Sequence, residues 1–228
     1  MFSPRRAKKV RLPIFAGMND LIRALHDYAT RLSSPPPPYL HQLERETHLT
    51  TLAPQMLSGS LQGRFLALLS KLMRPRRILE IGTFTGYGAL CLAEGLAPDD
   101  QLHTIEANPE REALIRKYLA EAGMTDRIHL HMGDALDLIP TLDEAFDLVF
   151  VDAGKQDYGR YFDLLIGRLP VGALLIADNV LWSGKILDPT SDADAQALHT
   201  FNERVRDDAR LESLILPLRD GLLLARKR

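Results

Sequence analysis

The chain has 228 residues, of which 46% are hydrophobic and 25% are charged, and its formal net charge at pH 7 is −2. These values are ordinary for a soluble globular protein and fit one α/β domain with a modest extension. The near-neutral charge gives no global reason to expect nucleic acid or an acidic membrane as a partner. No apolar run approaches the roughly 20 residues that cross a bilayer, and the lone Cys91 excludes an internal disulfide. We therefore expect a cytoplasmic protein with no membrane partner.

The N-terminal part of the chain is predicted to be an extension of the main fold. Residues 1–17 are rich in basic residues between Arg5 and Arg11, and we interpret them as a flexible basic arm. An arm that contacts RNA phosphates is the alternative. Asn19 or Asp20 is expected to cap the first of three helices. Apolar spacing places these helices at about 21–32, 39–52 and 61–72.

From residue 77 onward, apolar strands alternate with helices. The strands are expected at about 77–82, 101–106, 127–132, 147–152 and 172–178, and the helices at about 86–96, 109–122, 135–141, 157–169 and 193–208. Alternating βα units form a parallel sheet with helices on both faces, because their crossovers are right-handed. Leu211–Leu218 and Leu222–Arg226 are joined by a tight turn and should form an antiparallel hairpin at the sheet edge.

These patterns predict a doubly wound, seven-stranded α/β sheet with one antiparallel strand and an N-terminal helical extension. We expect residues 18–228 to form a single domain, with N-terminal helices at 18–73 and the sheet-containing core at 74–228.

The first strand of the core leads into a glycine-rich loop, in the segment RILEIGTFTGYG. Gly82, Gly86 and Gly88 would let the backbone approach a ligand just before a helix begins with unpaired N–H groups. An ordinary glycine-rich turn is the alternative for this loop taken alone. The functional interpretation is a nucleotide-type binding site.

Polar residues also follow the second and third strands. Ligands on such sheets bind beyond the carboxyl ends of the strands. Glu106 can accept hydrogen bonds there from two ribose hydroxyls. Gly133, Asp134 and Ala135 can border an adenine ring.

Asp152, Asp178 and Asn179 follow the fourth and fifth strands and offer only oxygen donors. Like charges crowded in a cleft are costly unless a cation lies between them. Oxygen donors suit a hard divalent ion, with Mg²⁺ first and Ca²⁺ or Mn²⁺ as alternatives, and argue against zinc. The alternative for Asp178 and Asn179 is that they only cap or turn the chain. Lys155 could reach the same cleft and act as a base, or it could be a surface lysine.

Four segments together resemble a known family, and they are ILEIGTFTGYGAL, FDLVFVDAGKQDYGRY, GALLIADNVLWSGKI and LPLRDGLLLARK. They are similar to the metal-dependent, S-adenosylmethionine (SAM)-dependent O-methyltransferases of the caffeoyl-CoA and catechol type, particularly the bacterial members. The resemblance runs from about Met56 to the C-terminus. It implies a Rossmann-like methyltransferase fold, SAM as cofactor and a homodimer.

The resemblance also implies a role for each matching position. The positions implied for the cofactor are Met56 and Ser58 at its border, Glu80 and Gly82 beside its amino-acid part, Glu106 at the ribose, Ala135 at the adenine and Tyr161 at the methionine end. Further cofactor contacts are expected from Gly88, Gly133, Asp134 and Asp152. The implied metal ligands are Asp152, Asp178 and Asn179. Lys155 and Asp152 would be the catalytic residues, with Lys155 as the candidate base, and Trp182 would belong to the acceptor pocket.

Two positions depart from the family pattern. Gly88 stands where a serine that bonds the cofactor carboxylate is common, so this contact should come from backbone N–H or water. Gly154 stands where a second aspartate is common, which leaves room above the metal. Neither position is one of the three implied ligands.

The predicted function is methyl transfer from SAM to a hydroxyl of a metal-chelated vicinal diol, such as a catechol or a caffeoyl-like small molecule. A free phenol has a pKa near ~10, so the site must stabilise the oxyanion as well as align the two reactants. One alternative is O-methylation of a hydroxylated tRNA base, for which the Arg5–Arg11 arm is the only support. A more distant alternative is a non-catalytic or hydride-transferring dinucleotide-binding protein. That alternative lacks the G-x-G-x-x-G pattern and gives the three oxygen donors no purpose.

Overall fold

The computed structural model describes residues 17–228. Residues 1–16, and with them nearly all of the predicted basic arm, lie outside the described residues.

The chain falls into two compact units that divide between Ser34 and Pro35. In the first unit, helix α1 (Met18–Leu32) follows an extended Gly17 and has no side-chain cap among the described residues. The predicted capping by Asn19 or Asp20 is therefore wrong, because both residues lie inside the helix.

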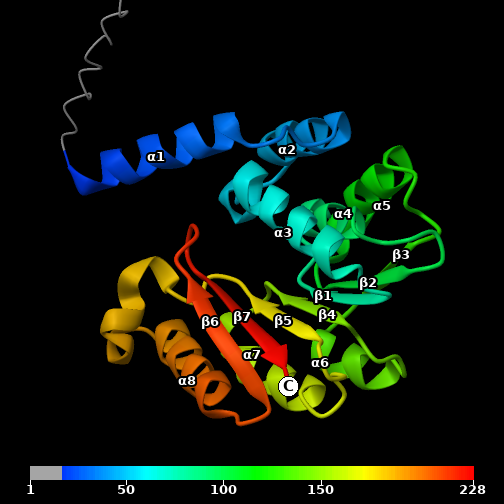
Figure 1. The fold of residues 1–228 in the computed structure, drawn as a ribbon. Helices are drawn as coiled ribbons and strands as arrows, with labels where there is room; N and C mark the ends of the chain where they lie inside the picture. The colour runs from blue at the N-terminus through cyan, green and yellow to red at the C-terminus, as the bar shows by residue number, and fades with distance from the viewer. Residues whose placement is uncertain (1–16) are drawn as a thin grey trace, which may run out of the picture. The chain divides into compact units, whose positions relative to one another are not determined.

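The second unit is built on a seven-stranded sheet in the order β3-β2-β1-β4-β5-β7-β6 (Figure 1). The strands are β1 (Arg77–Ile81), β2 (Gln101–Glu106), β3 (Ile128–Met132), β4 (Leu148–Val151), β5 (Leu174–Ala177), β6 (Leu211–Leu216) and β7 (Leu222–Lys227). The first five strands pair in parallel, and β7 runs antiparallel to both of its neighbours. The predicted sheet, its one antiparallel strand and the C-terminal hairpin are confirmed.

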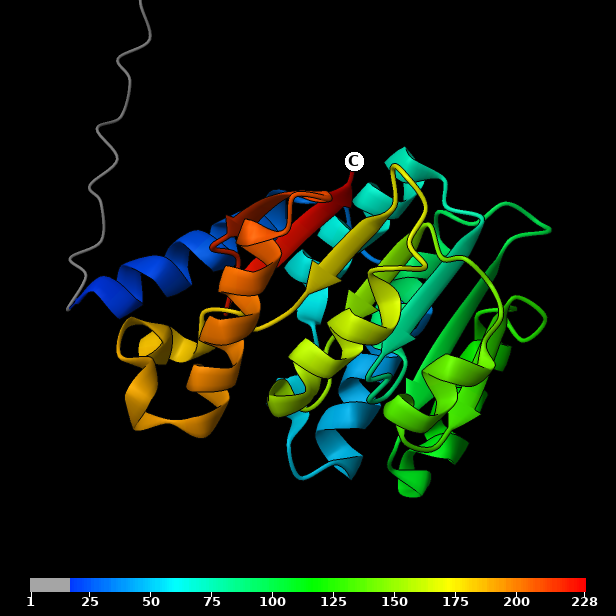
Figure 2. The ribbon, with the colours of Figure 1, turned by 90° about the horizontal axis from the view of Figure 1, so that it is seen from below.

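Helices cover both faces of this sheet (Figure 2). On one face lie α2 (Pro38–Thr50), α3 (Gly59–Met73), α4 (Tyr87–Ala93) and α5 (Glu112–Glu121), and on the other lie α6 (Ala135–Leu138), α7 (Tyr158–Leu165) and α8 (Ala193–Asp207). Short 3₁₀ turns join them, namely η1 (Pro54–Met56), η2 (Pro109–Arg111), η3 (Ile139–Thr141), η4 (Lys155–Asp157), η5 (Trp182–Leu187) and η6 (Pro189–Ser191). Because both faces are covered, all residues of β4 and β5 are buried.

Several helices end earlier than the sequence predicts. Helix α4 stops at Ala93 and α7 stops at Leu165. Leu96 and Leu169, the last residues of the two predicted helices, lie beyond these helix ends but are nevertheless buried. Apolar spacing locates the residues that face the core. It does not show whether the last of them lie in a helical turn or in an irregular segment, because both can pack against the core.

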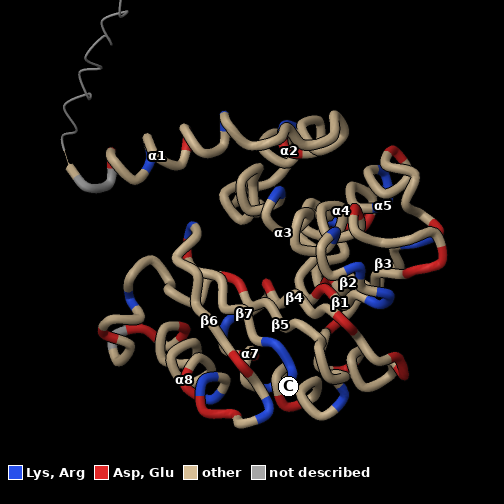
Figure 3. Tube along the Cα trace, viewed as in Figure 1, with Lys and Arg blue, Asp and Glu red and all other residues tan. Residues whose placement is uncertain are grey.

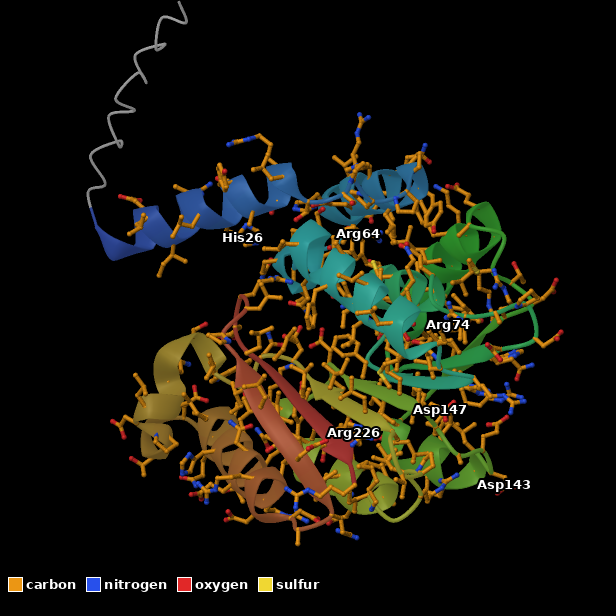
Figure 4. All side chains as sticks on the ribbon, in the orientation of Figure 1. His26, Arg64, Arg74, Asp143, Asp147 and Arg226 are labelled. Atoms are coloured by element: carbon orange, nitrogen blue, oxygen red, sulfur yellow. The ribbon has the colours of Figure 1, made fainter. Side chains whose placement is uncertain are left out.

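Charged side chains help to define the beginning of the sheet. The Asp147 carboxylate accepts hydrogen bonds from the backbone N–H groups of Arg76 and Arg77 at 2.8 and 3.1 Å, which ties the start of β1 to the segment before β4 (Figure 4). Elsewhere acidic and basic positions are interspersed along the described chain (Figure 3). Among the described helices, none has both the length and the apolar character needed to span a membrane.

Candidate active site

A cavity of about 820 Å³ lies at the carboxyl ends of the parallel strands. Most of the predicted site residues line it, and they are Met56, Gly82, Glu106, Gly133, Asp134, Ala135, Asp152, Lys155, Tyr161, Asp178, Asn179 and Trp182. The remaining three, Ser58, Glu80 and Gly88, line a small second cavity that shares Met56, Gly82 and Asp152 with the first. The fold therefore gathers every predicted site residue at one place, and their individual roles remain predictions.

The glycine loop passes close to the end of β4. A side chain at Gly82, whose φ is +94°, would place its Cβ 2.1 Å from the backbone oxygen of Asp152. Only glycine combines this backbone conformation with so close an approach. Gly86, also at φ +94°, precedes the first turn of α4. The glycine loop therefore packs directly against the backbone at the end of β4, where Asp152 lies.

Glu106 fixes two backbone segments at the cavity wall. Its carboxylate accepts hydrogen bonds from the backbone N–H groups of Phe84 at 2.7 Å and Asn108 at 2.9 Å. Phe84 has a left-handed backbone, at φ 53°, and the Arg111 guanidinium lies over its ring at 4.1 Å. Glu106 is 8% exposed. Its burial and its two hydrogen bonds together hold the carboxylate in place at the cavity wall.

Glu80 and Gly88 pack against each other beneath the loop. The Thr104 hydroxyl donates to Glu80 Oε2 at 2.5 Å. Burial raises the pKa of Glu80 to about 8, against the opposing effect of the Thr104 hydrogen bond and with a further rise from the charges of Asp152 and Glu106. A Cβ on Gly88 would lie 2.4 Å from Glu80 Oε1. The carboxyl group of Glu80 therefore lies where a side chain at position 88 would begin.

Among the three predicted oxygen donors, Asp178 is buried and held by two hydrogen bonds. Asp178 is 2% exposed, and its two oxygens accept hydrogen bonds from Gln62 Nε2 at 2.6 Å and from the Asn179 backbone N–H at 2.7 Å. Burial and then the charge of Asp152 raise the pKa of Asp178 to about 6. Within the described residues, no group of three or more His, Cys, Asp and Glu side chains is arranged to hold a metal. The predicted trio contains only two acids, and its third donor is the amide of Asn179.

Lys155 points toward the acids and away from solvent. Its side chain is 9% exposed, and its Nζ donates to Asp152 Oδ1 at 3.0 Å and to the Tyr158 hydroxyl at 2.8 Å. The Tyr158 hydroxyl also lies 3.0 Å from the backbone oxygen of Asp178. The alternative interpretation of Lys155 as a surface lysine is therefore wrong.

Trp182 is anchored by the beginning of α8. Its indole Nε1 donates to Asp192 Oδ1 at 3.1 Å, and the same oxygen accepts from the Ala195 backbone N–H at 3.0 Å. Hydrogen bonding from Lys185 is the main reason that the pKa of Asp192 is lowered, to about 2. Asp192 thus stays ionised and holds the indole at the cavity wall.

The sequence of residues 30–228 matches the model of the O-methyltransferase family. The chain belongs to the O-methyltransferase family. A catechol O-methyltransferase of Niastella koreensis is 35% identical over 174 residues, which cover 72% of this chain and 79% of that protein. A caffeoyl-CoA O-methyltransferase of Eucalyptus globulus is 33% identical over 184 residues, which cover 75% of each chain. The predicted membership of the catechol and caffeoyl-CoA type is confirmed.

Solved structures agree with this O-methyltransferase assignment. A methyltransferase of Podospora anserina bound to SAH matches with a TM-score of 0.87 and 28% identity, covering 94% of this chain and 98% of that chain. An O-methyltransferase of Streptomyces achromogenes in complex with SAM matches with a TM-score of 0.84 and 34% identity, covering 90% and 96%. The Rossmann-like methyltransferase fold is thereby confirmed.

Other residues of this O-methyltransferase reach the site without having been predicted. They are Gln62, which contacts Asp178, and Gln55, Phe84, Arg111, Gln156, Asp194 and Arg219, which line the larger cavity. No signal in the sequence separates Gln62 from the other polar residues of α3, such as Arg64 and Ser70. Arg219 belongs to a turn that sequence reasoning used only to define a hairpin.

Proposed function

We propose that this O-methyltransferase transfers the methyl group of SAM to one hydroxyl of a vicinal diol, such as a catechol or a caffeoyl-like small molecule. The observation that carries the proposal is the shared cavity, in which the predicted cofactor residues and the three oxygen donors meet at Asp152. The similarity to catechol and caffeoyl-CoA O-methyltransferases supports both acceptor types, and the SAH and SAM bound in similar solved structures support the cofactor.

For the cofactor, we propose that Glu106 receives the ribose hydroxyls, with Ala135 at the adenine and Tyr161 at the methionine end. Glu80 and Ser58, in the smaller cavity, would lie beside the amino-acid part. Since the carboxylate of Glu106 is already hydrogen-bonded to two backbone segments, the binding of SAM would require little reorganisation of the cavity wall.

We propose Asp152, Asp178 and Asn179 as the residues that would hold a divalent cation, with Mg²⁺ as the first candidate. Their donor set fits such an ion, because it is composed of oxygen and because the repulsion between Asp152 and buried Asp178 would be relieved by positive charge. A cation bound there would stabilise the oxyanion form of an acceptor hydroxyl.

Lys155 is the proposed catalytic base of this chain. Its Nζ is held between Asp152 and Tyr158, so it is positioned at the cavity before the acceptor binds. A phenol with a pKa near ~10 is mostly protonated at neutral pH. Lys155 would take the hydroxyl proton, or as an ammonium group it would offset the charge of the phenolate.

A screen of methyl transfer to catechols, caffeoyl esters and bulk tRNA, with and without Mg²⁺, tests this function. We expect transfer to a diol that chelation abolishes, and Asp178→Ala should lower kcat/KM by about 100-fold or more, as expected when a preorganised charge is lost. Asp126→Ala, at an exposed turn outside the cavity, should retain wild-type activity. Undiminished methylation of a catechol under chelation, or by Asp178→Ala, contradicts the metal role. Transfer to tRNA alone would favour the alternative acceptor, for which no described residue gives support.

We also propose that the protein is a cytoplasmic homodimer and that residues 18–228 act as one methyltransferase domain. The homodimer is supported by the resemblance to the family and the location by the composition. Light scattering on the purified full-length chain would measure the mass of the assembly, and a monomeric mass would contradict the dimer.

A further inference from the structure

Gln62 connects the acid Asp178 to Arg219, and both of these residues line the cavity. It lies in α3, is fully buried, and donates through Nε2 to Asp178 Oδ2 at 2.6 Å. On its other side, Oε1 accepts a hydrogen bond from Arg219 Nη1 at 3.4 Å. Arg219 Nη1 also donates to the backbone oxygen of Ser58. One amide side chain thus joins three segments that are far apart in the sequence.

The chemistry of the partners determines which way this amide points. The guanidinium of Arg219 has only donors, so it must face the amide oxygen of Gln62. The carboxylate of Asp178, when ionised, has only acceptors, so it must face the amide nitrogen. Turning the amide by 180° would place its NH₂ group against the Arg219 guanidinium, where both groups are donors. It would also place its oxygen against the Asp178 carboxylate, where both groups are acceptors. Arg219 therefore selects the orientation in which Gln62 donates to Asp178.

The position of Arg219 is in turn defined by the hairpin turn between β6 and β7. Arg219 has a left-handed backbone, at φ 52°. The turn is bonded to the segment after Asn179, since the Val180 and Leu181 N–H groups donate to the backbone oxygens of Gly221 at 3.1 Å and Asp220 at 2.9 Å. The backbone of the turn that carries Arg219 is thus bonded to the segment that follows Asp178 and Asn179.

We propose that Gln62 is a positioning residue that holds the Asp178 carboxylate in the orientation needed to bind a divalent cation, and that Arg219 holds Gln62. The inference rests on the proposed function, in which Asp178 is a metal ligand. Gln62 and the Asn179 N–H each use one lone-pair direction of a carboxylate oxygen, and a second direction on each oxygen stays available for a cation. Partners of this kind orient metal ligands in proteins, and their loss costs about 10- to 100-fold in metal affinity.

The test is the affinity of the full chain for Mn²⁺ and Mg²⁺, measured by electron paramagnetic resonance and by calorimetry, together with its affinity for SAH. Gln62→Met keeps the length of the side chain and removes both polar atoms. We expect it to weaken cation binding by about 10-fold or more and to change SAH binding by less than about 3-fold. The matched control is Gln196→Met, at an exposed position of α8, which should bind both ligands as the wild type does.

The outcomes distinguish the proposed metal role of Asp178 from the proposed positioning role of Gln62. If the wild type binds neither cation, the proposed metal role fails. If the wild type binds cations and Gln62→Met binds them equally well, the positioning role is wrong while the metal role stands. An equal loss of cation and SAH binding would indicate a general structural role for Gln62, which also contradicts the inference.

A second variant covers the case in which Gln62→Met does not fold. Arg219→Asn removes the guanidinium, and asparagine tolerates the left-handed backbone of this turn. We expect roughly a 3- to 10-fold loss of cation affinity, because the Gln62 amide loses its orienting donor. In the double variant the loss should not exceed that of Gln62→Met alone, since both act through one carboxylate. An unchanged cation affinity in Arg219→Asn would overturn the proposed action of Arg219 through Gln62.

Discussion

At the scale of single residues, Glu80 and Gly88 show how one position constrains another. Glu80 is a buried carboxyl group whose pKa is raised to about 8, mainly by burial, so it enters the core as a neutral acid. A Cβ on Gly88 would lie 2.4 Å from Glu80 Oε1. Gly88 therefore suits this chain because it leaves space for Glu80. A serine at position 88 would require Glu80 to move.

We predict that Gly88→Ala lowers the free energy of unfolding by about 1–3 kcal/mol, as expected for overpacking of a buried site. In a Glu80→Ala background the same substitution should be neutral or stabilising, since the conflicting oxygen is gone and alanine favours the helix over glycine by up to about 1 kcal/mol. Urea unfolding of the four proteins measures the coupling between the two positions. An equal effect of Gly88→Ala in both backgrounds would show that the contact with Glu80 is not the cause.

At the scale of secondary structure, strands β2 and β3 bring three histidines to one face of the sheet. His103 pairs in register with His129, and His131 lies two residues further along β3, on the same face. His103 Nδ1 and His131 Nε2 are 2.9 Å apart, and His103 Nε2 lies 3.5 Å from Glu144 Oε1. Burial lowers the pKa of His103 to about 4 and also lowers that of His131. The pair is therefore neutral in the folded protein at neutral pH.

This cluster predicts a loss of stability in acid. The pKa of His103 in the folded chain, about 4, lies below the unfolded value of about 6.5, so the unfolded chain binds more protons between these pH values. The stability from a neutral His103 is present above pH 6.5 and is lost as the pH falls toward 4. His103→Gln, which cannot gain a proton there, should show a shallower decline.

Urea midpoints measured from pH 4 to pH 8 check this expectation. The control is His199→Gln, because the His199 side chain is 40% exposed on α8, and it should keep the wild-type decline. A decline in His103→Gln as steep as that of the wild type would count against the histidine cluster as its source.

At the scale of the whole molecule, the order of the strands creates the site. The chain leaves β1 toward β2 on one side and later returns to β4 on the other, so the loops after β1 and β4 diverge at this switch point. The cavity of about 820 Å³ lies there, and five strand ends contribute to it. Ligand binding at such a junction should stabilise the whole sheet, since these residues are brought together only in the folded state.

We therefore expect SAH at 100 times its Kd to stabilise the protein by about 2.7 kcal/mol. For a chain of this size, that corresponds to a rise in Tm of roughly 5–10 °C. NAD at the same concentration should leave Tm unchanged, because the glycine loop lacks the dinucleotide pattern. Differential scanning calorimetry on the full chain measures both shifts. A rise with NAD and none with SAH would favour the distant dinucleotide-binding alternative.

Local sequence patterns were sufficient to predict most of the fold and to propose several site residues. Met56, Tyr161 and Trp182 were implied only by the family resemblance, and the roles of all these residues stay predictions. The alternation of strands and helices gives the parallel sheet, because crossover handedness leaves few other arrangements. Residues directly after a strand must lie at its carboxyl end, so Glu106, Asp152 and Asp178 could be placed together from their positions in the sequence. Helix ends and caps were less predictable, as Asn19 and Asp20 show, because several residues near a helix start can cap it equally well.

How these residues are held depends on contacts between segments that are distant in the sequence. Gln62 meets Asp178 across 116 positions of the chain, and Arg219 meets Ser58 across 161. Neither contact has a local signature, because both arise where α3 and the C-terminal hairpin approach the same strand ends. Periodicity located the strand ends, and with them Glu106, Asp152 and Asp178, but it gave no sign of Gln62 or Arg219. Packing decided which of them carry a proton, which are fixed and which face the cavity, since burial and neighbouring charge depend on contacts between distant segments.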